Sequence, residues 1–228
     1  MTDQQNQPVV LAVDIGGSHV KVLSSAGGAE RKAVSGPKMD AAVMAEAVEK
    51  LADGLQFDVL ALGYPGPVIH NKILSEPHNL ATGWIGFDFE KRFGKPVKIV
   101  NDALMQAIGS YDGGRMLFLG LGTGLGAAMI VDNVAQPMEI AHLPYRKGRT
   151  FEDYLGEASL EKRGLEKWTK HVFDATEQLT AALEPDYVVI GGGNVTRLKT
   201  LPPNARRGDN TNAFKGGFAL WLDESLKV

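Results

Sequence analysis

The chain has 228 residues, of which 44% are hydrophobic, so it can bury a core as one compact unit or as two small lobes. Its net charge of −3 gives no basic field for nucleic acid or an anionic membrane, and the lack of cysteine excludes disulfides, thiolate nucleophiles and cysteine-built metal sites. No stretch approaches the roughly 20 apolar residues of a membrane span, and residues 1–8 carry no signal core. We therefore expect a cytoplasmic protein with a disordered lead-in at 1–8.

The first half of the chain alternates between predicted strands and helices. Short apolar runs at 9–14 and 20–25 flank a glycine turn and predict an antiparallel strand pair. Apolar residues spaced three to four apart predict a helix over 39–51, and a buried strand follows at 58–63. The loop "YPGP" stops that strand, and a further strand at 97–100 precedes a helix that Asn101 or Asp102 can cap.

The second half repeats this order. Two apolar runs, 115–122 and 126–131, flank another glycine turn, and a helix at 165–183 precedes a strand at 187–190. The repetition predicts an α/β protein of two related lobes, with the N-terminal lobe at 9–101 and the C-terminal lobe at 102–228. The last helix, about 210–224, is a candidate to pack back on the N-terminal lobe.

Three glycine-rich loops are candidates for binding phosphate, because glycine permits the close backbone approach that an anion site lined by N–H groups requires. They are "DIGGSHVK" (14–21), "LGLGTGLGAA" (119–128) and "IGGGNV" (190–195). Taken singly, each is explained equally well as a tight turn without a ligand. The central loop also matches G-x-G-x-x-A, but it opens a strand instead of a helix, which excludes a dinucleotide site, and no Walker sequence occurs.

Asn101 and Asp102 follow a strand, at the position where catalytic groups emerge in α/β folds. A helix cap is the alternative explanation for this pair. Phosphoryl transfer to a hydroxyl needs a carboxylate to take the proton and N–H groups or cations around the phosphate, and Asp102 with the three loops supplies both. The spacing of Glu139 and His142 suits a metal, but no further His or Cys lies nearby for a tight zinc site, and no nucleophile elbow occurs.

Seven motifs occur in the order found in one protein family: "DIGGSHVK", "YPGPV", "HNL", "VNDA", "LGTGLGAA", "EIAH" and "VVIGGGN". Over residues 9–222 the sequence resembles the ROK family of sugar kinases. Within it, "AHLPYRKGRTFEDYLG" and "GDNTNAFKGGFALW" resemble the polyphosphate glucokinases. The resemblance implies a two-lobed actin-like ATPase (ribonuclease H-like) fold with the active site in the inter-lobe cleft.

The resemblance also implies a role for each motif residue. Asp102 would be the catalytic base, and the sugar hydroxyls would be held by Asn101, Asp102, Glu139, His142 and Glu152, with Glu157 as the less favoured alternative to Glu152. Asp14 would lie near Mg²⁺, through water. No zinc is expected, because "LPYRKGRT" replaces the cysteine-rich hairpin of most members. The phosphate-binding residues would be Asp14, Gly16, Gly17, Ser18, Lys21, Gly122, Thr123, Gly124, Gly126, Gly191, Gly192, Gly193, Lys147 and Arg149.

The function predicted is a polyphosphate-dependent glucokinase that phosphorylates the C6 hydroxyl of glucose, with ATP as an alternative donor. A polyanionic donor needs a cationic path, for which the available clusters are Arg146, Lys147, Arg149, Arg206 and Arg207. Ordinary solvated surface charges are the alternative explanation of these clusters.

The competing functions are an ATP-dependent ROK hexose kinase and a non-catalytic sugar-binding regulator. Only about eight residues precede the first strand, which disfavours a helix-turn-helix repressor. Family members are commonly homodimers, and no nucleic-acid or membrane partner is expected.

Overall fold

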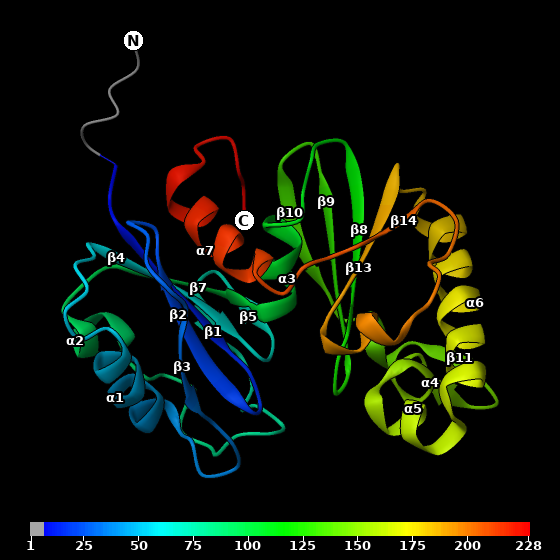
Figure 1. Ribbon diagram of the computed structural model, residues 1–228, viewed down its shortest axis with the longest axis horizontal. Helices are drawn as coiled ribbons and strands as arrows, with labels where there is room; N and C mark the ends of the chain where they lie inside the picture. Colours follow the sequence, from blue (N-terminus) through cyan, green and yellow to red (C-terminus); the bar gives the residue numbers. More distant parts are fainter. Residues whose placement is uncertain (1–6) are drawn as a thin grey trace. The chain divides into compact units, whose positions relative to one another are not determined.

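The structure is a computed structural model that describes residues 7–228, and the chain forms two compact units (Figure 1). Unit 1 contains the residues up to Met105 together with Ala213–Leu226. Unit 2 contains Gln106–Asn212 and Lys227–Val228. The lead-in predicted at 1–8 lies outside the described residues as far as residue 6, and the next two residues have no regular secondary structure.

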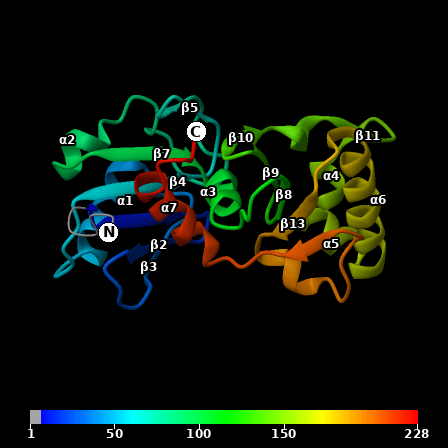
Figure 2. The same ribbon diagram turned by 90° about the horizontal axis from the view of Figure 1, so that it is seen from above.

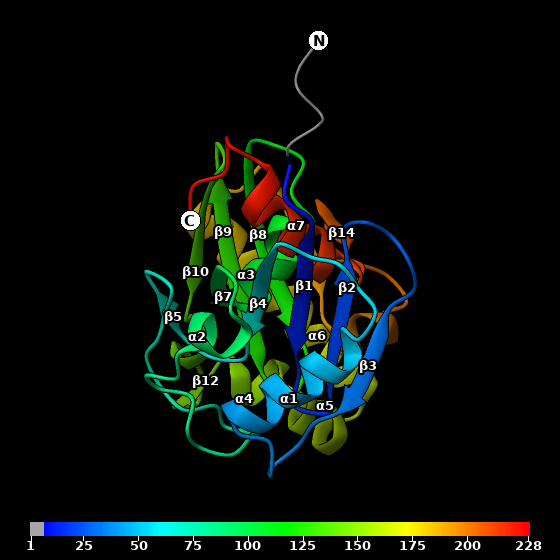
Figure 3. The same cartoon turned by 90° about the vertical axis from the view of Figure 1, so that its left-hand side faces the viewer.

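Unit 1 is built on a five-stranded sheet in the order β3-β2-β1-β4-β7. Strands β1 and β2 are antiparallel, as are β2 and β3, whereas β4 runs parallel to both β1 and β7. Figure 3 shows β2, β1, β4 and β7 side by side. The strands are β1 (Val10–Ile15), β2 (His19–Ser24), β3 (Arg31–Val34), β4 (Val59–Tyr64) and β7 (Val97–Asn101).

Helices cover both faces of this sheet. Asp40 caps α1 (Ala41–Leu51) by accepting the N–H of Val43 at 2.8 Å, and α1 buries Met44 and Val48 in the same core as Leu11. On the opposite face, α7 (Asn212–Leu222) brings Gly217 so close to Ala12 that a Cβ on the glycine would lie 2.7 Å from the alanine Cβ. Alternate residues of β1 therefore pack against two different helices, α1 on one face of the sheet and α7 on the other. The remaining elements are the hairpin β5 (Val68–Ile69) and β6 (Lys72–Ile73), α2 (Phe89–Phe93) and α3 (Asp102–Ile108).

Unit 2 repeats the topology. Its sheet has the order β10-β9-β8-β13-β14. Strand β9 is antiparallel to both β8 and β10, whereas β13 is parallel to both β8 and β14. The prediction of two related α/β lobes is thus confirmed by strand order. The strands are β8 (Arg115–Leu121), β9 (Leu125–Val131), β10 (Val134–Met138), β13 (Tyr187–Gly191) and β14 (Ala205–Arg207).

The helices of unit 2 gather on one face of its sheet (Figures 1 and 2). The long helix α6 (Leu165–Leu183) buries Trp168, Val172 and Leu179 in the core that lies under β8. Shorter elements precede and follow it: η1 (Ile140–His142), β11 (Pro144–Arg146), β12 (Arg149–Thr150), α4 (Glu152–Leu155), α5 (Glu157–Arg163) and η2 (Gly193–Arg197). Among the described residues, none of the helices is long and apolar enough to cross a membrane.

The division between the units falls inside α3, after Met105, whereas the predicted boundary is at 101/102. The first turn of α3 packs on unit 1, since a Cβ on Gly63 of β4 would lie 2.5 Å from the Met105 side chain. The chain returns to unit 1 at Ala213 and leaves it again after Leu226. The last helix therefore belongs to unit 1, and Lys227 donates its N–H to Asn133 in unit 2 at 2.9 Å.

Candidate functional site

The carboxyl ends of β1, β4 and β7 meet at one edge of the unit 1 sheet, because these three strands are parallel. This edge brings together the first glycine loop, the "YPGP" loop and the Asn101–Asp102 pair. Asn101 joins two of them: its Nδ2 donates to Gly66 O at 3.1 Å, and its Oδ1 accepts the N–H of Leu104 at 3.1 Å. Asn101 therefore caps α3 and fixes the loop at the same time.

Asp102 is the first residue of α3 and is partly exposed. Its Oδ1 accepts the N–H of Ala103 at 2.8 Å. The cap bond to the N–H three residues on is made by Asn101. The alternative explanation, a helix cap, thus holds for Asn101, and Asp102 stands at the sheet edge expected of a catalytic carboxylate.

The first glycine loop folds as a tight connection between β1 and β2. Gly16 donates its N–H to His19 O at 2.9 Å, and the Ser35 hydroxyl donates to Gly16 O at 2.6 Å. Gly17 and Ser18 are exposed, and within the described part of the chain their N–H groups have no hydrogen-bond acceptor. These two N–H groups are free to bind an anion.

Asp14 and Lys21 are directly opposite each other on β1 and β2, with Lys21 Nζ 3.8 Å from Asp14 Oδ2. Burial raises the pKa of the Asp14 carboxyl, and the nearby Lys21 ammonium opposes that shift. Lys21 therefore lies beside the predicted magnesium residue instead of at the tip of the loop. Across the part of the chain that the structure describes, no group of three or more His, Cys, Asp or Glu side chains is placed to hold a metal ion.

The second and third glycine loops touch each other in unit 2. The turn Gly122–Thr123–Gly124 joins β8 to β9, and Asn194 donates its Nδ2 to Gly122 O at 3.1 Å. Gly192 has φ of +81°, and a Cβ there would lie 2.4 Å from Leu121 O. Only glycine fits at this position, since both the conformation and the space exclude a side chain. Gly126, in contrast, lies within β9 and is paired with Gly120.

Of the five predicted sugar-binding residues, Glu152 has the most defined surroundings in unit 2. Its Oε2 accepts the N–H of Leu125 at 3.1 Å, so the carboxylate lies against the second glycine turn. Glu139 directly precedes η1 and His142 is its last residue, so the three-residue period of the helix places them on the same side. Both side chains are exposed, and the i, i+3 spacing thus presents two polar groups to solvent.

The basic stretch "YRKGR" forms the hairpin β11–β12. Lys147 and Gly148 both have positive φ, +50° and +69°, as a two-residue turn of type I′ requires. Arg146 pairs with Asp174 of α6, with Nη2 3.0 Å from Oδ1. Lys147 and Arg149 are exposed, and neither makes an ion pair with another described residue.

The second pair of cations has a structural role. Arg206 pairs with Asp112 and donates to Ser110 O, and its guanidinium stacks over the Tyr187 ring at 4.8 Å from the centroid. Arg207 donates to Leu198 O at 2.8 Å and also to Val195 O. These arginines hold β14 to its neighbours, so of the five candidate cations Lys147 and Arg149 are the two without an ion pair or a backbone acceptor among the described residues.

A cluster that sequence reasoning missed fastens the β11–β12 hairpin to α6. The Tyr145 hydroxyl donates to Asp174 and lies 3.2 Å from His171 Nδ1, and the His171 ring packs edge-on against Tyr154 at 4.6 Å. Burial, and then the nearby Arg163 and Arg146, lower the pKa of His171. His171 is partly buried because Tyr145 of the hairpin packs against its ring.

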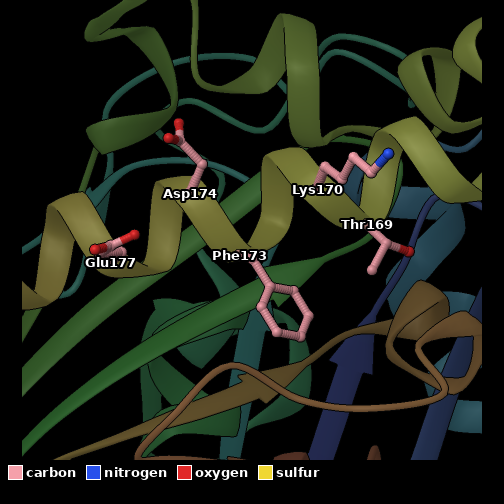
Figure 4. A pocket seen from close by; sticks show the side chains of 5 residues that line it. All are labelled: Thr169, Lys170, Phe173, Asp174 and Glu177. Atoms are coloured by element: carbon pink, nitrogen blue, oxygen red, sulfur yellow. The ribbon is translucent and has the colours of Figure 1, made fainter.

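A hollow of about 430 Å³ lies along α6 and is lined by Thr169, Lys170, Phe173, Asp174 and Glu177. Figure 4 shows Asp174 and Phe173 pointing to different sides of the helix. None of these side chains belongs to the predicted site. The hollow is thus a surface feature of one helix and is separate from the glycine loops.

A model described as the ROK family matches residues 10–137, more than half of the chain. The chain belongs to the ROK family. No curated protein sequence matches this ROK chain. Among solved structures, an inorganic polyphosphate/ATP-glucomannokinase from Arthrobacter sp. strain KM is similar with a TM-score of 0.81 at 22% identity, covering 94% of this chain and 98% of the other.

Two other ROK structures show the range of relatives. A ROK family glucokinase from Streptomyces griseus, solved with glucose and AMPPNP, has a TM-score of 0.71 at 17% identity, covering 93% of this chain and 99% of the other. A ROK family transcriptional regulator, a homologue of the E. coli MLC protein, has a TM-score of 0.70 at 14% identity, covering 93% of this chain and 77% of the other. These likenesses show the fold, which is that of the actin-like ATPases, as the sequence resemblance implied.

Proposed function

We propose that this ROK chain is a sugar kinase that transfers a phosphoryl group from inorganic polyphosphate to the C6 hydroxyl of glucose. The observation that carries the proposal is the edge of the unit 1 sheet, where Asp14 lies near the end of β1 and the first glycine loop and Asp102 follow the parallel strands β1 and β7. A carboxylate to accept a proton and free N–H groups for phosphate are the two requirements of phosphoryl transfer to an alcohol. Family membership and the intact glycine turns of unit 2 support the same reaction.

Asp102 accepts the proton of the C6 hydroxyl, and the resulting oxygen attacks the terminal phosphorus of the donor. The bond from that phosphorus to its bridging oxygen breaks, and the shortened polyphosphate leaves with the electron pair. Backbone N–H groups of the glycine loops stabilise the charge that develops on the phosphoryl oxygens. The residues proposed to hold the sugar are Asn101, Asp102, Glu139, His142 and Glu152.

Asp14 is suited to a magnesium ion. Its carboxylate is an oxygen ligand of the kind that Mg²⁺ prefers, and burial raises its pKa, so a second cation beside Lys21 would favour the ionised form. Mg²⁺ bound to the donor phosphates would neutralise part of their charge. Asp14 would hold it through water, since Mg²⁺ usually keeps several waters and takes few protein ligands.

The polyphosphate donor is supported by the β11–β12 hairpin. Lys147 and Arg149 stand at an exposed turn without ion-pair partners among residues 7–228, and two such charges suit a chain of successive phosphates. The Arthrobacter structure, with its polyphosphate/ATP description, supports this donor by similarity. The homodimer and the cytoplasmic location stay predictions.

An ATP-dependent hexose kinase is the second candidate. The observation that favours it is the third glycine loop, because Gly192 is packed on Leu121 in a conformation that only glycine adopts. The sequence resemblance places Gly191, Gly192 and Gly193 of this loop among the phosphate-binding residues.

One assay separates these functions. Formation of glucose 6-phosphate is measured with the purified chain, Mg²⁺ and glucose, in parallel with polyphosphate, with ATP and with no donor. Product with polyphosphate supports the first proposal, and product with ATP alone supports the second. No product with either donor, from a folded chain that binds glucose, would indicate the non-catalytic regulator.

A further inference from the structure

The two oxygens of the Glu152 carboxylate have different surroundings. Oε2 accepts the N–H of Leu125, the residue directly after the Gly122–Gly124 turn, at 3.1 Å. Oε1 has no hydrogen-bond partner in the described range 7–228, and the side chain is partly exposed. One oxygen is therefore engaged with the glycine turn, and the other is open to a ligand.

The backbone next to Glu152 holds the same turn. Glu157, the first residue of α5, donates its N–H to both Gly122 O and Thr123 O at 3.1 Å. A Cβ on Gly156 would lie 2.8 Å from Thr123 O, and a Cβ on Gly124 would lie 2.2 Å from Glu152 Oε2. Segment 152–157 and turn 122–125 are thus packed without spare room, and a change at Glu152 is felt at the turn.

We propose that Glu152 is a positioning residue that couples the acceptor sugar to the donor loop. The inference rests on the proposed function, in which a sugar hydroxyl binds Glu152 and turn 122–125 holds donor phosphate. The hydroxyl donates to Oε1 while Oε2 keeps the N–H of Leu125, so bound sugar immobilises the carboxylate and the carboxylate immobilises the turn. The donor then meets N–H groups that are already ordered, which costs less entropy on binding.

Linkage makes this coupling reciprocal: each substrate raises the affinity for the other by the same factor. The arrangement also gives a physical reason for a glycine at 124, since the carboxylate occupies the space that a side chain would need. Sugar bound to Glu152 would thereby order turn 122–125, which belongs to the same unit 2.

The first test measures hydrogen exchange of the Leu125 amide in the full chain by NMR. Glu152→Ala removes the acceptor and is expected to speed exchange on the order of tenfold, as loss of a hydrogen bond to a charged group implies. Glu152→Gln keeps an acceptor oxygen and is expected to restore most of the protection. Glu157→Gln is the matched control, because its side chain is exposed and only its backbone N–H forms hydrogen bonds with the turn. Unchanged exchange in Glu152→Ala overturns the proposal.

The second test adds glucose at saturation, with binding checked by calorimetry. Wild-type Leu125 exchange is expected to slow further, and the affinity for tripolyphosphate to rise on the order of fivefold. Both effects are expected to be absent in Glu152→Ala. If glucose binds and is phosphorylated while the Leu125 amide does not respond, the coupling is overturned and the proposed function stands. If no donor yields glucose 6-phosphate and glucose does not bind, the proposed function fails and the coupling fails with it.

Discussion

Arg146 and Asp174 form an ion pair across the β11–β12 hairpin and α6, with Arg146 Nη2 3.0 Å from Asp174 Oδ1. The pair divides the three cations of "RKGR" into two kinds. Arg146 is paired with Asp174 and anchors the hairpin, whereas Lys147 and Arg149 are exposed and form no ion pair with another described residue. The three residues are therefore expected to respond differently to mutation.

Replacing Lys147 and Arg149 together with glutamine is expected to raise the KM for polyphosphate on the order of tenfold at low salt, since exposed charge interactions contribute up to about 1 kcal/mol each. The KM for ATP should change less, because ATP carries fewer phosphates. Arg146→Gln is the matched control and should have the smaller effect on KM, because Asp174 already offsets its charge. Equal KM values for wild type and the double variant would show that the two cations face only water.

Asp102→Asn tests the proposed base. The kcat for glucose phosphorylation is expected to fall about 10²–10⁴-fold, as loss of a positioned general base implies. Glucose binding, measured by calorimetry, should remain detectable because the amide still offers a hydrogen-bonding oxygen. Circular dichroism verifies that the variant is folded. A kcat near that of the wild type would remove Asp102 from the mechanism.

Gly192→Ala should destabilise the chain by at least about 2 kcal/mol, since the alanine Cβ would strike the Leu121 backbone and the φ of +81° suits only glycine. Urea unfolding measures the loss. Gly193→Ala is the neighbouring control, because nothing lies within 4 Å of a Cβ there. Comparable losses in the two variants would contradict the close packing described for the third glycine loop.

His171 should make unit 2 less stable in mild acid. Its pKa in the folded protein is lowered by burial and by Arg163 and Arg146, so below the unfolded value of about 6.5 the unfolded chain binds more protons. Stability is then lost as the pH falls through that value, and none is lost above it. His171→Gln should flatten the decline between about pH 7.5 and pH 5.5, measured by urea unfolding at each pH. An unchanged slope would mean that other groups cause the loss.

The long, buried elements were predictable because their patterns are local. The helix predicted at 39–51 appears as α1, and the apolar runs beside the glycine turns appear as β1, β2, β8 and β9. Edge strands were missed: β3 reads Arg-Lys-Ala-Val and is mostly exposed, so no alternation marks it. Its strand conformation comes from pairing with β2, which a single-sequence pattern does not contain.

The residue types of the candidate site were readable from motifs, but their partners were not. Tyr145 and Asp174 are far apart in sequence, and only the packing of the hairpin on α6 joins them. The hydrogen bond from the Leu125 N–H to Glu152 uses a backbone donor, which every residue except proline has. The residue type at position 125 therefore does not predict this bond. The same holds for Arg207, whose acceptors are both backbone carbonyls.

The return of the chain to unit 1 bears on how the protein is made. The Trp221 indole donates to Leu60 O at 2.9 Å, and Lys98 Nζ donates to Leu220 O at 2.6 Å. Helix α7 therefore covers one face of a sheet whose first strand begins at residue 10. During synthesis, the part of that sheet face that carries Ala12 and Ala61 and packs against α7 stays uncovered until residue 222 has left the ribosome. The first-made lobe is thus the last to be completed, and unit 2 can fold while unit 1 still waits for its closing helix.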